Sequence, residues 1–156
     1  QEPVVMTIEK EDYAFQAKLF TVENVDDGIA EMDIEIKKVA LAKPYTIEDI
    51  KYTTASAEIE KKSKWVLDQF ALYLQAHPDL QISIQGHTDN IGGTKENLTL
   101  STERAFEVMN YLQYKGVQAG SMTFKGFGSG KPVADNSTES GRAKNRRTEF
   151  IIQSIK

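Results

Sequence analysis

Residues 80–112 constrain the fold of this chain more than any other stretch, because a strand pattern is followed directly by a helix pattern. Leu80, Ile82 and Ile84 alternate with polar residues, which is typical of a strand with one buried face. Gly86 ends the alternation at a point where the backbone can turn freely. From about Thr94 the apolar residues recur at helical spacing, and we expect four of them to face a core: Leu98, Ala105, Met109 and Leu112. The stretch is therefore predicted to fold as strand, polar loop and helix.

Polar side chains lie on both sides of this predicted loop. Residues 87–90, His-Thr-Asp-Asn, follow the strand end directly. Asn97, Ser101 and Arg104 fall on one face of the helix, since residues three, four and seven apart share a face. Asp89 and Arg104 can thus converge on one small ligand. The same spacing also fits a structural salt bridge that ties the loop to the helix.

The rest of residues 44–156 predicts an α+β domain. Lys43-Pro44 marks a plausible boundary, because proline cannot donate to a strand ladder. The remaining elements are expected in this order: a strand over 47–53, a helix that begins at Thr54 or Ser56 and ends before Pro78, a strand over 122–124, a short helix over 139–144 and a strand over 148–155. Right-handed crossovers then place two main helices on one face of a mixed sheet.

Residues 1–43 form a separate stretch with its own pattern. Short alternating runs over 4–8, 13–20 and 32–36 are separated by acidic breaks, which favours β-strands and turns. They are too few for a robust sandwich, so we expect them to pack on the main domain or to be the remnant of an upstream domain. No chemistry is assigned to them.

Composition excludes several classes of function. Residues 44–156 hold 13 acidic and 14 basic side chains, and a near-neutral domain argues against nucleic-acid binding. No run approaches the ~20 apolar residues of a membrane-spanning helix. The absence of cysteine excludes disulfides and thiolate metal sites. The first residues lack the pattern of a signal peptide, so a mature or trimmed fragment is expected.

The motifs of known catalytic sites are missing from the sequence. The run Gly126–Pro132 lacks the spacing of a phosphate-binding loop, and proline replaces the Ser/Thr that would hold magnesium. Zinc would have to use His77, His87 and carboxylates without a recognisable spacing. No motif places a second carboxylate near Asp89 for glycoside cleavage. We therefore expect no enzyme, no cofactor and no metal, with His87 ordering its loop.

A series of motifs resembles the OmpA C-terminal-like domain, the family of the peptidoglycan-associated lipoprotein and of the periplasmic part of flagellar stators. The motifs occur in order over about residues 47–152: Gly86-His87-Thr88-Asp89-Asn90, Asn97-x-x-Leu100-Ser101-x-x-Arg104-Ala105, Gly126-Phe127-Gly128, Lys131-Pro132 and Gly141-Arg142-Ala143-x-Asn145-Arg146-Arg147. The resemblance implies a βαβαβ(α)β mixed sheet. The N-terminal segment is similar to segments that precede such domains in some Bacteroidetes-type envelope proteins.

The resemblance also implies a ligand. In the family, the positions of Asp89 and Arg104 hold the diaminopimelate residue of the peptidoglycan stem peptide. Asn97 then bonds the peptide backbone or is a helix-start amide, and Leu100 lines the methylene chain of the ligand or belongs to the core. The implied function is noncovalent anchoring of a periplasmic, outer-membrane-associated protein to the cell wall.

Supporting roles fall to three further residues. Thr88 and Asn90 are expected to shape the loop through local hydrogen bonds. Arg147 is expected to pair with the acid of the site, and Arg146 fits that part equally well.

The sequence departs from the family pattern at two positions, and this keeps other functions open. Tyr52-Thr53-Thr54 stands where the family has an aromatic residue followed by an acid or Asn, and Ser129 replaces an acid in the glycine turn. One alternative is an envelope interaction domain that has lost its ligand. The other, which the missing motifs disfavour, is a cell-wall hydrolase.

Overall fold

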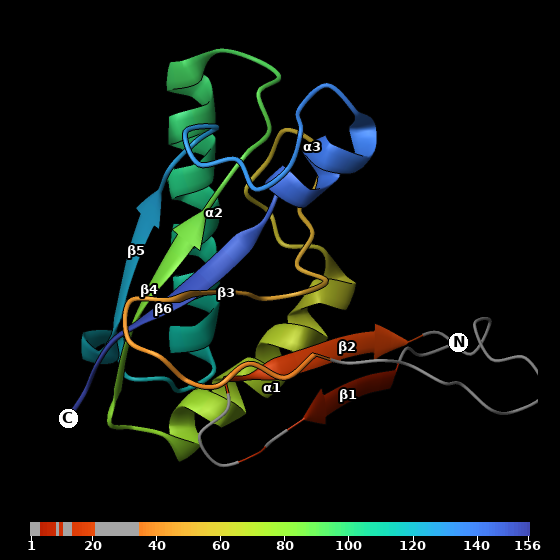
Figure 1. The fold of residues 1–156 in the computed structure, drawn as a ribbon. Coiled ribbons are helices and arrows are strands. Elements are labelled where there is room, and N and C mark those ends of the chain that lie inside the picture. The colour runs from red at the N-terminus through yellow and green to blue at the C-terminus, as the bar shows by residue number, and fades with distance from the viewer. Residues whose placement is uncertain (1–3, 9, 11–13, 21–34) are drawn as a thin grey trace, which may run out of the picture.

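The chain folds into a four-stranded mixed sheet with two long helices on one face and a two-stranded hairpin beside them (Figure 1). The computed structural model describes residues 4–8, 10, 14–20 and 35–156. Its strands are β1 (Val4–Ile8), β2 (Gln16–Phe20), β3 (Pro44–Thr46), β4 (Leu80–Gly86), β5 (Met122–Gly126) and β6 (Thr148–Ile155). Its α-helices are α1 (Lys61–Ala76), α2 (Thr94–Tyr114) and α3 (Glu139–Asn145).

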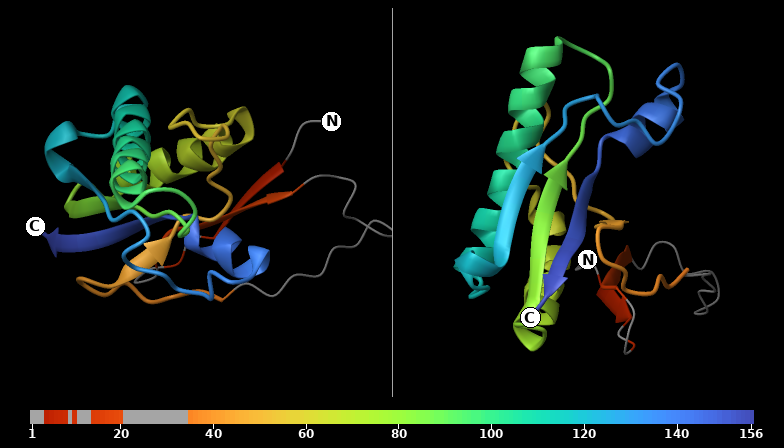
Figure 2. Two further views of the ribbon diagram at one scale, coloured as in Figure 1. Left: turned by 90° about the horizontal axis from the view of Figure 1, so that it is seen from above. Right: turned by 60° about the vertical axis from the view of Figure 1, so that its left-hand side comes forward.

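The strands of the main sheet lie in the order β3-β6-β4-β5. β4 and β5 are parallel and are joined by α2, whereas β6 runs antiparallel to both of its neighbours, β3 and β4. Seen from above, α1 and α2 lie on the same side of the sheet (Figure 2). This layout confirms the predicted α+β fold. None of the helices in the described part of the chain has the length and apolar sequence needed to cross a bilayer.

The core lies between this sheet and the helices. Ile82 and Ile84 of β4 are fully buried and are paired in register with Ile152 and Phe150 of β6. Phe70 of α1 meets Phe150 with ring centroids 4.9 Å apart. The alternation read from the sequence of β4 therefore reports its buried face correctly.

The buried face of α2 is turned relative to the prediction. Its buried residues are Asn97, Ser101, Ala105, Val108 and Leu112. Leu98, which was expected in the core, is 49% exposed, and Met109 only packs against the core edge. The expectation was wrong for Leu98 because two polar residues of α2, Asn97 and Ser101, take the positions that face the loops above the sheet.

Residues 47–60 differ most from the prediction. The first strand of the sheet is Pro44–Thr46 rather than 47–53, and α1 begins at Lys61 rather than after Thr54. Asp49 and Ala55 have φ values of 60° and 52°, in the left-handed region that neither a strand nor a helix allows. Asp49 precedes a tight hairpin over residues 51–60, described below, and Ala55 lies within it.

The described part of the N-terminal stretch packs on α1, as expected. β1 and β2 pair antiparallel from Val4↔Phe20 to Ile8↔Gln16. Phe15 is buried and lies 4.9 Å from Phe70 and 5.5 Å from Tyr73, measured between ring centroids. The third predicted strand, over 32–36, lies mostly outside the described residues. The predicted boundary at residue 43 stays a prediction, although Phe15 joins the common core.

Candidate functional site

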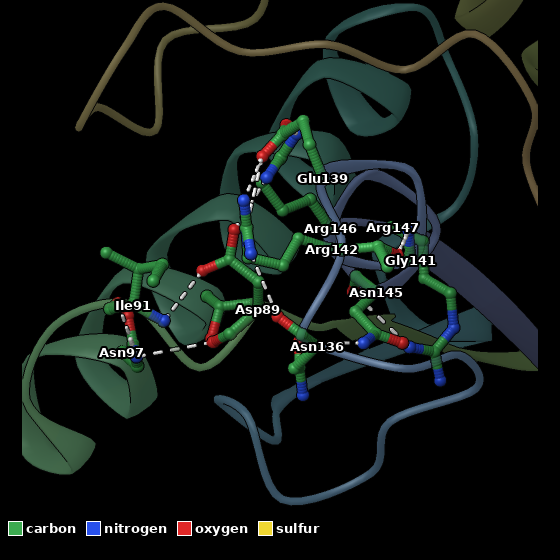
Figure 3. Close-up of polar contacts among 12 residues, drawn as sticks. Asp89, Ile91, Asn97, Asn136, Glu139, Gly141, Arg142, Asn145, Arg146 and Arg147 are labelled. Atoms are coloured by element: carbon green, nitrogen blue, oxygen red, sulfur yellow. Dashed lines mark hydrogen bonds and ion pairs between the residues drawn. The ribbon is translucent and has the colours of Figure 1, made fainter.

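The loop that follows β4 carries Asp89 at the edge of the sheet. Asp89 is only 8% exposed, and both of its carboxylate oxygens are engaged. Oδ1 accepts a hydrogen bond of 3.0 Å from the N–H of Ile91, which closes a local turn. Oδ2 pairs with Nη1 of Arg146 at 2.6 Å (Figure 3). A carboxylate offers about four acceptor positions, so Asp89 retains capacity for one further donor.

Arg146 links this acid to a second one. Its Nη2 pairs with Glu139 of α3 at 2.6 Å, and Arg142 pairs with the other oxygen of Glu139 at 3.0 Å (Figure 3). The hydrogen bonds that Arg146 donates to Asp89 and Glu139 raise its pKa. The pairing also decides between the two arginines left open above: the partner of Asp89 is Arg146, and the expectation for Arg147 was wrong.

Arg147 instead belongs to a buried polar group under the loop. Its Nε pairs with Oε1 of Glu149 at 2.6 Å, and its Nη2 donates to the carbonyl of Lys131 at 3.1 Å. His87, stacked on Phe127 with ring centroids 5.2 Å apart, brings Nε2 to within 3.2 Å of Oε2 of Glu149. Burial raises the pKa of Glu149, but His87 and Arg147 lower it by more, so the acid stays charged. These contacts hold the loop, and His87 and Arg147 also line the cleft described below.

Arg104 has a different environment, without an acid partner among the described residues. Its Nε donates to the carbonyl of Ser56 at 2.9 Å, and its guanidinium carbon lies 4.7 Å from the ring centroid of Tyr52. Burial lowers the pKa of Arg104. The neighbouring Tyr52 and Asp89 oppose this decrease, whereas the positive charge of Arg146 lowers the pKa further. Asp89 therefore lies near enough to Arg104 to affect its pKa. The two side chains do not form the salt bridge that the sequence left open as an alternative, since Asp89 pairs with Arg146.

The other predicted residues surround this pair. Asn97 donates from Nδ2 to the carbonyls of Ile91, at 3.0 Å, and Asp89, at 3.4 Å, so it holds the loop. Thr88 is buried and donates from Oγ1 to the carbonyl of Asp89 at 2.9 Å. Asn90 is exposed, and Leu100 is half-buried one turn before Arg104.

A cleft of about 1000 Å³ opens beside Arg104 and Arg146, and Asp89 is not among the residues that line it. Its lining includes Tyr52, His87, Arg104, Arg146, Arg147 and Thr148. Sequence reasoning missed Tyr52 and Ser56 as neighbours of Arg104, because residues 47–60 were assigned to a strand and a helix. The aromatic position at Tyr52 was the one available signal. The described residues contain no group of three or more side chains suited to a metal ion.

The family assignment follows from a match to a family model. The model of the OmpA family matches residues 52–146, which is more than half of the chain and includes Asp89, Arg104 and Arg146. The chain belongs to the OmpA family. The resemblance stated from the motifs is thereby confirmed.

One relative and two solved structures illustrate what this OmpA-family domain is similar to. It is 42% identical over 87 residues to the peptidoglycan-binding protein ArfA of Mycobacterium tuberculosis, covering 56% of this chain but only 27% of ArfA. The structure of the peptidoglycan-associated lipoprotein of Burkholderia pseudomallei aligns with a TM-score of 0.60 at 33% identity, over 70% of this chain and 89% of that one. The cell wall anchor of the type VI secretion system (T6SS) of Pseudomonas aeruginosa aligns with a TM-score of 0.59 at 33% identity, over 66% and 74% of the two chains.

Proposed function

We propose that this domain binds peptidoglycan noncovalently, through the diaminopimelate residue of the stem peptide. It would thereby anchor an outer-membrane-associated parent protein to the cell wall from the periplasmic side of the envelope. The observation that carries the proposal is Arg104, a half-buried guanidinium with no acid partner among the described residues, set beside the acid Asp89. Relatives named as a peptidoglycan-binding protein, a peptidoglycan-associated lipoprotein and a cell wall anchor support it.

The chemistry of the ligand matches the two charges. Diaminopimelate carries a free ammonium and a free carboxylate on one carbon, at the end of an apolar methylene chain. Asp89 accepts from the ammonium, and the planar guanidinium of Arg104 grips the carboxylate through two parallel hydrogen bonds, which lysine cannot reproduce. Leu100, one turn before Arg104, lines the methylene chain. Thr88 and Asn97 keep the loop in place through hydrogen bonds to its carbonyls, and Arg147 supports it through Glu149.

Calorimetric titration with a diaminopimelate-containing stem peptide tests this proposal. Asp89→Ala and Arg104→Ala should each weaken binding by on the order of 2–5 kcal/mol, because each leaves the opposite charge of the ligand unpaired. Lys62→Ala, which removes an exposed cation from α1, is the control and should bind like the wild type. Circular dichroism checks that all variants are folded.

Two results would contradict the proposal. A wild-type protein that does not bind the peptide at millimolar concentration would favour an envelope interaction domain without this ligand. Release of soluble muropeptides from purified sacculi by the wild type would instead indicate a hydrolase.

A further inference from the structure

The hairpin over residues 51–60 contacts Arg104 from a part of the chain to which no function has been assigned. Tyr52 and Ile59 form an antiparallel bridge, and the N–H of Thr53 donates to the carbonyl of Glu58 at 2.9 Å. The hairpin thereby presents the ring of Tyr52 and the carbonyl of Ser56 to the same guanidinium.

These two contacts restrain Arg104 in complementary ways. The carbonyl of Ser56 accepts from Nε, and the guanidinium carbon lies over the ring of Tyr52, 4.7 Å from its centroid. In the described residues no acceptor binds the two terminal nitrogens, and Arg104 lines the cleft. The terminal N–H groups thus form the free fork that suits the two oxygens of a carboxylate.

Tyr52 is itself held firmly and is uncharged. Its hydroxyl hydrogen-bonds to Oγ1 of Thr148, at the start of β6, over 2.7 Å. Burial raises the pKa of Tyr52 to about 12, against the opposing effects of Thr148 and Arg104. The phenol therefore stays protonated at neutral pH, and its contact with Arg104 is that of a cation on a neutral ring rather than an ion pair.

We propose that Tyr52 is a positioning residue for Arg104 and gives the site its preference for a free carboxylate over an amide at the end of the ligand. The proposal rests on the proposed function. Its basis is that a carboxylate accepts from both terminal N–H groups of an oriented guanidinium, whereas a primary amide has one acceptor oxygen and opposes the second N–H with its own NH₂. If the guanidinium can rotate, this geometric discrimination is lost.

The experiment compares two stem peptides, with the free carboxylate of diaminopimelate intact or converted to the primary amide. Wild type should prefer the acid by roughly 10- to 100-fold in Kd, as expected for charge-assisted hydrogen bonds. Tyr52→Phe keeps the ring and loses only the bond to Thr148, so its preference should stay within about threefold of wild type. Tyr52→Leu removes the ring and should weaken acid binding by roughly tenfold, with little change for the amide.

A measurement without ligand complements the titrations. The NMR signal of the Nε–H group of Arg104 should carry a ring-current shift in wild type and in Tyr52→Phe, and should lose it in Tyr52→Leu. Tyr52→Met serves as a second ringless variant if Tyr52→Leu is unfolded.

Three results would overturn the proposal. Tyr52→Leu that weakens both peptides equally would make Tyr52 a purely structural residue. Unchanged affinities of Tyr52→Leu for both peptides would remove Tyr52 from recognition altogether. A wild type that binds the acid and the amide equally well would refute the preference while leaving the proposed function intact, whereas failure to bind either peptide would refute the proposed function itself.

Discussion

Glu149 is the residue on which the support of the loop that carries Asp89 depends. It is 6% exposed, it faces Arg147 and His87, and Arg147 in turn holds the carbonyl of Lys131 in the glycine turn. A buried acid between two basic groups is costly to desolvate, but removing it leaves the positive charge of Arg147 without a partner.

Glu149→Gln should therefore destabilise the protein at pH 7 by on the order of 3–5 kcal/mol in urea unfolding. The pKa of Glu149 is depressed in the folded state, below the ordinary value of 4.5. The stabilisation of the folded state by charged Glu149 is thus complete above about pH 4.5, and it is lost as the pH falls through the lower, folded-state pKa. The difference in the free energy of unfolding between wild type and Glu149→Gln should become smaller in that acid range. A gap that stayed constant from pH 7 to pH 3 would contradict this role.

At this scale the sequence predicted the two charged residues of the candidate site but not the residues that hold them. Asp89 and Arg104 were predicted because each stands in a motif, at a strand tip and on a helix face. The choice between Arg146 and Arg147 was not accessible, because adjacent side chains point in different directions that only the end of α3 and the start of β6 fix. Tyr52 and Ser56 were missed because their hairpin depends on hydrogen bonds within the segment.

At the scale of elements, the packing of α2 on the sheet depends on two paired glycines. Gly86 of β4 lies opposite Gly126 of β5. A Cβ atom on Gly86 would lie 2.1 Å from the carbonyl oxygen of Ser101, and one on Gly126 would lie 2.4 Å from the backbone nitrogen of Thr102. The helix can approach the strand ends closely only because both positions lack a side chain. This contact sets the distance between the loop of Asp89 and the helix of Arg104.

Gly86→Ala should consequently push α2 away from β4 and destabilise the protein by about 1–3 kcal/mol or more, as overpacking does. Gly120→Ala is the matched control, because a Cβ atom there meets nothing within 4 Å. Its effect should stay within about 0.5 kcal/mol. Chemical unfolding followed by the fluorescence of Trp65 measures both. Equal effects of the two substitutions would refute the close packing argument.

Elements with a strong periodic pattern were predicted well, and one short irregular segment was not. β4 and α2 begin where the sequence indicated, since alternation and helical spacing are each sustained there. Between 47 and 60 two residues with positive φ, Asp49 and Ala55, interrupt what looked like a strand and a helix. Neither is glycine, so their composition gave no warning.

At the scale of the whole molecule, the β1–β2 hairpin and the main sheet share one hydrophobic core. Phe15 lies among the rings of Phe70 and Tyr73 on α1. The carboxylate of Asp49, in the cleft wall, accepts from the N–H of Leu19 at 3.1 Å. We expect the N-terminal stretch to unfold together with the main domain.

Phe15→Ala tests this expectation. Removal of a buried phenylalanine from a shared core should cost about 3–5 kcal/mol in the single unfolding transition. Val4→Ala, at a position that is 59% exposed, should cost far less. A loss below about 1 kcal/mol for Phe15→Ala, or two separate transitions in calorimetry, would show that residues 1–43 are an independent unit.

The position of β6 has a consequence for how the protein is made. β6 lies between β3 and β4 in the sheet. Among the named strands β3 pairs only with β6, although β3 precedes β6 by about a hundred residues in the chain. A ribosome that has completed everything up to residue 147 has therefore produced the three α-helices and three strands of the main sheet, but not β6, the strand that joins β3 to β4. Contacts between residues that are distant in sequence, such as those of β3 with β6, form slowly and late in folding. Folding of the main sheet should thus wait until β6 has been synthesised, and chains truncated before β6 should be degraded by proteases.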